Sequence, residues 1–132
     1  MTVLEDALVA YIEAQVTAAG NGYPHEVPED ADFPAWSYKT IDDDQLLSHA
    51  GGTGFYTARM QLEFMAEESA SESDYAIIKG IASTARSVLD GYKGSWGTVQ
   101  VKFCKTRLSD EWADLHKLPV QRFDVDINYK LT

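Results

Sequence analysis

The chain has 132 residues, of which 45% are hydrophobic, and this length and composition suit one compact domain with its own core. Eleven basic against 21 acidic residues give a net charge of −10, which argues against a protein that grips DNA or an anionic membrane, because both need cationic contacts. No stretch approaches the roughly 20 consecutive apolar residues of a membrane span. The one cysteine, Cys104, excludes an internal disulfide and fits a reducing compartment.

The N-terminal part of the chain predicts one helix and one strand. Residues 2–19 place apolar side chains at helical spacing, and Thr2 and Glu5 have the spacing of a capping box. Gly20 ends the helix, and a proline-containing loop follows. Residues 35–41 are aromatic and β-branched, which favours a first strand.

A long alternation of apolar and polar residues predicts a second strand over residues 55–66. The apolar positions all fall on one face, and they are Tyr56, Ala58, Met60, Leu62, Phe64 and Ala66. A strand with one polar face lies half-buried at the surface of a core. The intervening segment 42–54 contains three aspartates and a glycine cluster, and we interpret it as a hairpin loop.

The C-terminal half repeats the order of a helix followed by two strands. Serine N-caps precede an apolar stripe that predicts a helix over residues 74–90. Residues 98–106 and 120–131 alternate as strands do. Residues 109–118, between these strands, are expected to hold a short helical turn.

Together these elements predict an α+β fold in the order α-β-β-α-β-β. Each element is apolar on one face, so the elements should stack as two layers. We expect a four-stranded, largely antiparallel or mixed sheet with both helices packed on one face. Residues 1–132 should form a single domain, since no linker or repeat divides them.

Segment 42–54 contains three kinds of residue that active sites use: aspartates, a histidine and clustered glycines. Asp42, Asp43 and Asp44 are potential ligands for Mg²⁺ or Ca²⁺, but the alternate spacing and distant glutamate of a calcium loop are absent. His49 has no positioned nucleophile or second ligand near it in the sequence. The glycines at 51, 52 and 54 lack the lysine of a phosphate loop and precede a strand. A solvated hairpin tip explains all three features.

The third predicted strand raises two further candidates. Val99, Val101 and Phe103 should point inward, which puts Cys104 on the other face, half exposed and structural. Trp112 falls in the following connector, where an interface role is plausible for an aromatic side chain. No catalytic set is found, which favours a non-enzymatic protein.

Basic residues cluster on or beside the last two strands, at Lys102, Lys105, Arg107 and Arg122. One interpretation is a solvated sheet face with cross-strand ion pairs to Asp124 and Asp126. The other is a contact with an oppositely charged surface on a neighbouring subunit.

The stretch "SHAGGTGFYTARMQLEFMAEESASESDYAIIKGIASTARSVLDGYKGSWGTVQV" resembles small tail-completion proteins of long-tailed bacteriophages, also described as tail terminators or tail-to-head joining proteins. The same family order includes an acidic first helix, here "LEDALVAYIEA", a strand after a proline, "FPAWSYKTI", and a closing strand, "FDVDINYKL". The resemblance covers nearly the whole chain. The segment "DEWADLHKLP" departs from the family pattern.

The resemblance implies a structural virion protein, without catalytic residues, metal or cofactor. Such a subunit forms a ring, commonly of six, on the major tail tube protein at the head-proximal end of the tail. The ring also meets a head-completion or connector protein, and DNA passes through its bore without specific binding. The protein would stay in the host cytoplasm before assembly and would not bind a membrane.

The expected contacts between subunits or with partners join the acidic segment of one copy to the basic face of another. The candidate residues are Asp42, Asp43, Asp44, Gln45, Leu46, Leu47, His49, Lys102, Lys105, Arg122 and Trp112. Two alternatives from other classes stay open. One is a soluble acidic binding or inhibitor module that presents carboxylates to a basic protein, and the other is a small metal-dependent enzyme.

Overall fold

The computed structural model describes residues 3–25, 27, 34–48, 51–65, 72–113 and 119–131. This part of the chain forms two α-helices, one 3₁₀ turn and six strands. The helical elements are α1 (Val3–Gln15), η1 (Thr17–Ala19) and α2 (Glu72–Leu89). The strands are β1 (Gly22–Pro24), β2 (Ala35–Ser48), β3 (Gly51–Met65), β4 (Gly94–Trp96), β5 (Val99–Ala113) and β6 (Pro119–Leu131).

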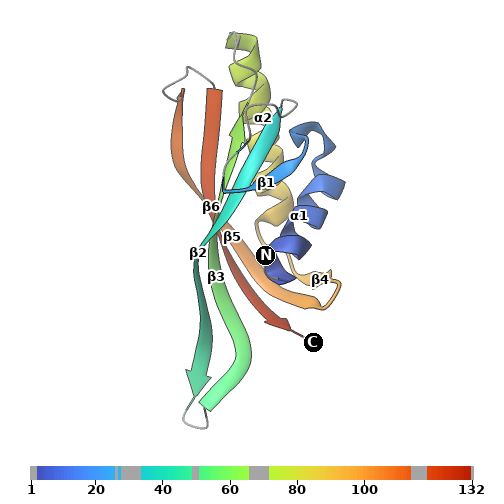
Figure 1. The fold of residues 1–132 in the computed structure, drawn as a ribbon, viewed down its shortest axis with the longest axis vertical. Helices are drawn as coiled ribbons and strands as arrows, with labels where there is room; N and C mark the ends of the chain where they lie inside the picture. Colours follow the sequence, from blue (N-terminus) through green and yellow to red (C-terminus); the bar gives the residue numbers. More distant parts are fainter. Residues whose placement is uncertain are drawn as a thin grey trace.

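The strands form one mixed, curled sheet in the order β1-β2-β3-β6-β5-β4 (Figure 1). β1 pairs with β2 in parallel, and the other neighbouring pairs are antiparallel. The expected four-stranded α+β sheet is therefore wrong, and the protein is mostly β. The two added strands, β1 and β4, contain three residues each, which is too short for a period-2 pattern to be recognised.

Both helices lie on the same side of the sheet (Figure 1). α1 buries Leu4, Leu8 and Ile12, which follow one another at four-residue spacing. The expected helix over 2–19 ends early, at Gln15, and a 3₁₀ turn replaces its last residues. Gly20 then adopts a φ of 77°, and a Cβ at this position would lie 2.0 Å from the Pro34 carbonyl oxygen, so only glycine fits.

The core between the helices and the sheet is built around stacked aromatic rings. The ring centroids of Trp36 and Phe64 are 5.7 Å apart, and those of Phe64 and Phe123 are also 5.7 Å apart. These three side chains come from the neighbouring strands β2, β3 and β6, and all are fully buried. The alternation predicted for β3 is confirmed, because Ala58, Met60, Leu62 and Phe64 are each 0% exposed.

A β-bulge in β5 overturns the prediction for its side chains. The register shifts between Val101 and Phe103, so Lys102 is an extra residue without an opposite partner. Beyond it the two faces exchange, which leaves Phe103 47% exposed and Cys104 fully buried. Burial, with a smaller effect from Asp90, raises the pKa of the Cys104 thiol to about 12. The inward Phe103 and half-exposed Cys104 expected from the alternation are therefore wrong.

Two segments expected to be irregular or helical are extended strands. β2 continues to Ser48 and β3 begins at Gly51, so the interpretation of 42–54 as a hairpin loop is wrong. β5 continues to Ala113, where a helical turn was expected. Both segments are extended because antiparallel pairing, of β2 with β3 and of β5 with β6, satisfies their backbone hydrogen-bonding groups.

Replacing Leu62 by alanine should lower the free energy of unfolding by about 2–5 kcal/mol, because it opens a cavity in a closely packed core. Chemical denaturation would measure this loss. Gln61→Ala, at the next position on the opposite face, is the matched control and should change stability by less than about 0.5 kcal/mol. An equally small loss for Leu62→Ala would contradict this packing.

Candidate functional site

The outer face of the sheet, away from the helices, carries rows of alternating charge. The register places Asp42 opposite Arg59, Arg59 opposite Asp126, and Asp126 opposite Lys105. One row therefore runs acid, base, acid, base across β2, β3, β6 and β5. Opposite charges facing each other on adjacent strands stabilise a sheet. The cross-strand interpretation of the basic cluster is thus supported by the register.

Asp126 is at the centre of this face. Its carboxylate accepts hydrogen bonds from Arg59 Nε at 3.0 Å and from Arg107 Nη2 at 2.6 Å. Partial burial favours the neutral acid, but the hydrogen bonds and positive charges of both arginines outweigh it and lower the pKa of Asp126. This carboxylate remains ionised and is shared between two strands.

Arg122 also has its partner within the chain. Its guanidinium donates to Glu63 Oε2 from Nε at 3.0 Å and from Nη2 at 2.8 Å. Both side chains are about four-fifths buried, at 22% and 20% exposure. Arg122, which the sequence predicts to meet the acidic segment of a neighbour, is paired with Glu63 of its own chain in a partly buried position.

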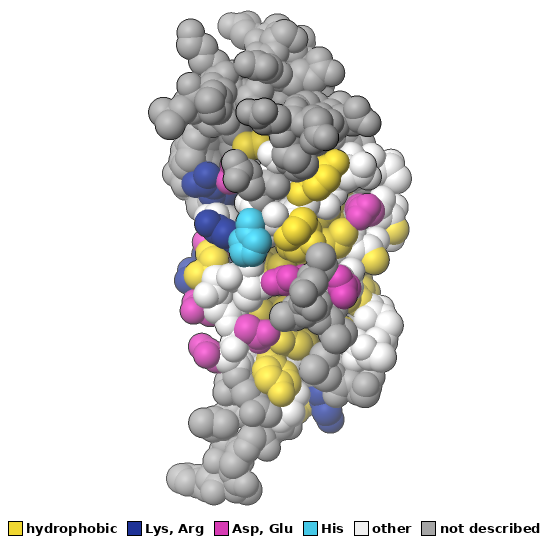
Figure 2. All heavy atoms as spheres, in the orientation of Figure 1, with side chains coloured by type: hydrophobic (Ala, Val, Ile, Leu, Met, Phe, Trp, Pro, Cys, Tyr) yellow, Lys and Arg dark blue, Asp and Glu magenta, His cyan; other side chains and the backbone are white. Residues whose placement is uncertain are grey.

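A hollow with a volume of about 320 Å³ opens on the same outer face. It is lined by Asp42, Asp44, Thr57, Arg59, Phe103, Lys105, Asp126 and Asn128. Most of these groups already face one another, as in the hydrogen bond that Thr57 donates to Asn128 at 2.7 Å. On the left of Figure 2, Lys and Arg side chains lie next to Asp and Glu side chains. The face is strongly polar, with both signs of charge interspersed.

The three consecutive aspartates do not act together. A bulge between Thr40 and Asp42 turns Asp42 and Asp44 to the outer face and Asp43 to the helix side. There the Tyr129 hydroxyl donates to both carboxylate oxygens of Asp43 at 2.8 Å. Burial, then this bond, raises the pKa of Tyr129. Within the described ranges, no three His, Cys, Asp or Glu side chains gather as metal ligands would.

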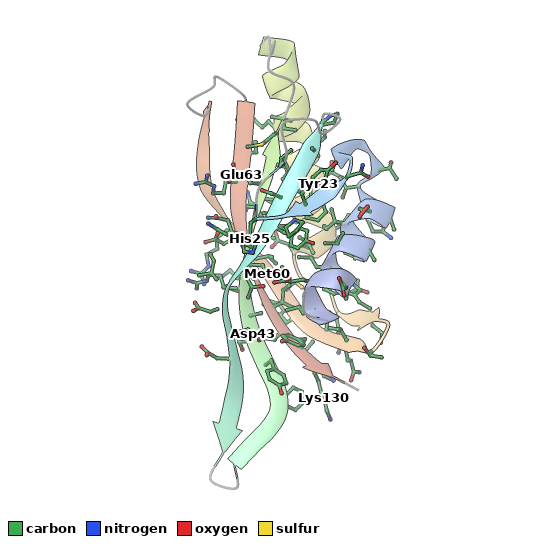
Figure 3. The ribbon with its side chains drawn as sticks, in the orientation of Figure 1. Tyr23, His25, Asp43, Met60, Glu63 and Lys130 are labelled. Atoms are coloured by element: carbon green, nitrogen blue, oxygen red, sulfur yellow. The ribbon has the colours of Figure 1, made fainter. Side chains whose placement is uncertain are left out.

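The remaining candidates are spread over the sheet. Lys102 is the extra residue of the β5 bulge, and its Nζ lies 5.9 Å from the ring centroid of Phe55. Lys130, labelled in Figure 3, lies over the same ring at 5.4 Å. Trp112 belongs to β5, but its side chain lies outside the described part of the chain, and His49 lies outside it altogether.

Gln45, Leu46 and Leu47 belong to a projecting hairpin arm, which we define as residues 45–48 of β2 and 51–54 of β3. β3 pairs with β6 only from Phe55 onward, so within the described part the arm pairs only with itself. Figure 1 shows this hairpin extending beyond the lower end of the sheet. The sequence prediction described these residues as a loop, whereas the structure places them in paired strands.

Sequence reasoning missed a second hollow, the Trp96 groove, between α1 and the turn after β4. Its volume is about 480 Å³, and its lining is mainly apolar. The lining residues are Asp6, Ala7, Ala10, Tyr11, Trp96, Gly97 and Thr98. The sequence signal was weak, since helix α1 and the turn after β4 are far apart in the chain and only folding brings them together.

Trp96 has an unusual environment in this groove. Its ring forms a three-ring cluster with those of Tyr11 and Tyr92, whose centroids lie 5.0 and 5.4 Å from it and 4.8 Å from each other. Tyr11 is held in turn by a 2.8 Å hydrogen bond to the carbonyl oxygen of Val88 in α2. The indole nitrogen Nε1 is buried and meets no acceptor among the residues that the structure describes. A buried donor without a partner lowers the stability of the fold, and an acceptor brought to it would remove that cost.

The edge of β5 that does not pair with β6 is covered along part of its length by the turn that follows α2. The Gly91 amide donates to the Cys104 carbonyl oxygen at 2.8 Å, and the Thr106 amide donates to Asp90 Oδ1 at 2.7 Å. β4 covers the preceding residues of the strand, from Val99 to Val101. This part of the edge is therefore unavailable for pairing with another strand.

Comparison with known proteins finds likeness at the level of the fold. No protein-family model and no curated protein matches the chain. The fold is similar to that of a chain in a solved structure described as the virion of a native gene transfer agent (GTA) particle, with a TM-score of 0.60 and 13% sequence identity. The match covers 92% of this chain and 84% of that chain. At this identity the likeness shows a shared fold. No helix in the described part is long and apolar enough to cross a membrane.

The lowered pKa of Asp126 predicts a specific dependence of stability on pH. An acid with a lowered folded-state pKa stabilises the fold above its unfolded pKa, near 3.9, and this contribution disappears as the pH falls through the folded-state pKa. Asp126→Asn should therefore cost about 1 kcal/mol at neutral pH, the upper end for partly exposed ion pairs. Denaturation curves at several pH values should show the difference from wild type shrinking below about pH 4. A difference that stays constant into strong acid would contradict the pairing.

Proposed function

We propose that this chain is a structural protein of a phage-like virion, which caps the tail tube and joins it to the head connector. The observation that carries the proposal is the likeness of its fold, over 92% of its length, to a chain of the gene transfer agent virion. The order of motifs that resembles tail-completion proteins supports the position at the head-proximal end of the tail. In this role the protein assembles as a ring.

The charge of the chain suits a ring through which DNA passes. Its net charge is −10, so the phosphate backbone would be repelled rather than held. The arginines of the outer face are paired within the chain, since Arg59 and Arg107 share Asp126 and Arg122 pairs with Glu63. A ring of such acidic subunits would let DNA pass during packaging and ejection without holding it.

We also propose that the protein is not an enzyme. Two described groups with the potential for chemistry have structural roles in the fold: Cys104 is buried with a thiol pKa raised to about 12, and Asp43 accepts from Tyr129. A reactive cysteine needs a lowered pKa and access to solvent. The partners that follow are other copies of the chain, the major tail tube protein and a head-completion or connector protein.

The acidic binding module is a weaker candidate. It needs a stripe of carboxylates that can meet a basic partner, whereas Asp43, Asp126 and Glu63 are each engaged within the chain. Asp42 and Asp44 are exposed on the outer face, but Arg59 stands opposite the first of them.

Deleting the gene from the virus that encodes this chain should give overlong or headless tails in electron micrographs, and a plasmid copy should restore joined particles. Immunogold labelling of restored particles should mark the head–tail junction. Infectious particles of normal shape from the deletion would overturn the proposed role, and labelling of the capsid or the tail tip alone would overturn its place at the junction.

A further inference from the structure

We propose that the Trp96 groove receives the hairpin arm of a second copy of this chain. The inference rests on the proposed ring, and it names the two surfaces that meet in it. The contact joins two different faces, which is the kind of contact that builds a closed ring instead of a symmetric pair.

The first argument is the character of the groove. Its lining is mainly apolar, and the small side chains of Ala7 and Ala10 allow a backbone to approach α1 closely. The apolar surface of Trp96, Tyr11 and the two alanines would be removed from water by an extended segment laid along it. Aromatic anchors of this type carry much of the binding energy in protein interfaces.

The second argument is the buried N–H of Trp96. This residue is 8% exposed, and no acceptor for Nε1 is found among the described residues. Trp96 lines the groove, but Nε1 itself is buried, so an incoming backbone would reach this donor only with a small shift of the lining. Such a contact would remove the cost of an unsatisfied donor in addition to burying apolar surface.

The third argument is the composition of the arm. Residues 45–54, "QLLSHAGGTG", contain no Asp, Glu, Lys or Arg, although the chain as a whole has a net charge of −10. Copies that repel one another at long range need an uncharged point of contact, and this segment supplies it with two leucines.

The placement of the arm favours contact between copies. It extends past the end of β6, away from the body of the subunit and away from α1 (Figure 1). The described edge of β5 is partly closed by the turn after α2 and by β4, and on the outer face Arg59 and Arg107 are paired with Asp126. The arm and the groove are thus a complementary pair of surfaces that the fold itself leaves unused.

Disulfide trapping between two single-cysteine additions tests the contact directly. Ala10→Cys protein mixed with Leu47→Cys protein should give a cross-linked heterodimer under mild oxidation, whereas Ser83→Cys, at an exposed position on α2, should not cross-link with Leu47→Cys. The native Cys104 is fully buried and does not compete. Equal trapping by Ser83→Cys, or no heterodimer at the highest soluble concentration and raised salt, would overturn the inference.

Matched charge substitutions provide the second measurement. Ala10→Glu should weaken self-association in sedimentation equilibrium by about tenfold or more, because it buries an unpaired carboxylate at the contact. Ser83→Glu adds the same charge on the other helix and should leave association unchanged. Trp96→Phe should also weaken association, because it removes the N–H donor while keeping an aromatic ring. Association that tolerates Ala10→Glu as well as Ser83→Glu would contradict the groove as the contact.

The outcome separates this inference from the proposed function. If the gene deletion gives unjoined tails but Ala10→Glu restores normal particles as well as the wild-type chain does, the groove is excluded and the virion role stands. If the deletion has no effect on particles while the cross-link forms, the contact stands and the role at the tail is overturned.

Discussion

The structure depends on a sheet that has one apolar face and one polar face. Both helices cover the apolar face, where Trp36, Phe64 and Phe123 stack across three strands. The opposite face must then remain in water, and it does so with rows of alternating charge. One register both buries the apolar side chains and pairs the charges across strands. A shift of one residue would therefore expose apolar side chains and separate the paired charges at once.

The β-bulges adjust this register where strict alternation would fail. The bulge at Ile41 turns Asp43 toward Tyr129 and leaves Asp42 opposite Arg59. The bulge at Lys102 buries Cys104 and exposes Phe103. Each of these two bulges leaves a large apolar side chain 46–47% exposed, Ile41 in the first case and Phe103 in the second. Bulges also increase local twist, which fits the curled form of this sheet.

The proposed assembly uses two surfaces that are not needed to form the sheet or its core, the hairpin arm and the Trp96 groove. Arg59, Arg107 and Arg122 on the outer face are paired within the chain, so these arginines contribute little to the attraction of another copy. The projecting arm is uncharged, and the Trp96 groove is apolar, with a donor that meets no acceptor among the described residues. A ring built from such contacts would depend on burial and one hydrogen bond more than on long-range attraction. It would therefore tolerate the self-repulsion of a chain with a net charge of −10.

The sequence by itself determined the elements with long, regular patterns: the alternation of β3 and β6, the apolar stripes of α1 and α2, and a largely one-sided sheet. These are local properties, because the period of the hydrophobic pattern follows from the geometry of each element alone. Only the tertiary structure decided the short strands β1 and β4, the extension of β2 and β5, and the faces of Asp43, Phe103 and Cys104. An extra residue in one strand is defined only against the strand beside it, and the groove at Trp96 exists only once α1 and β4 are brought together.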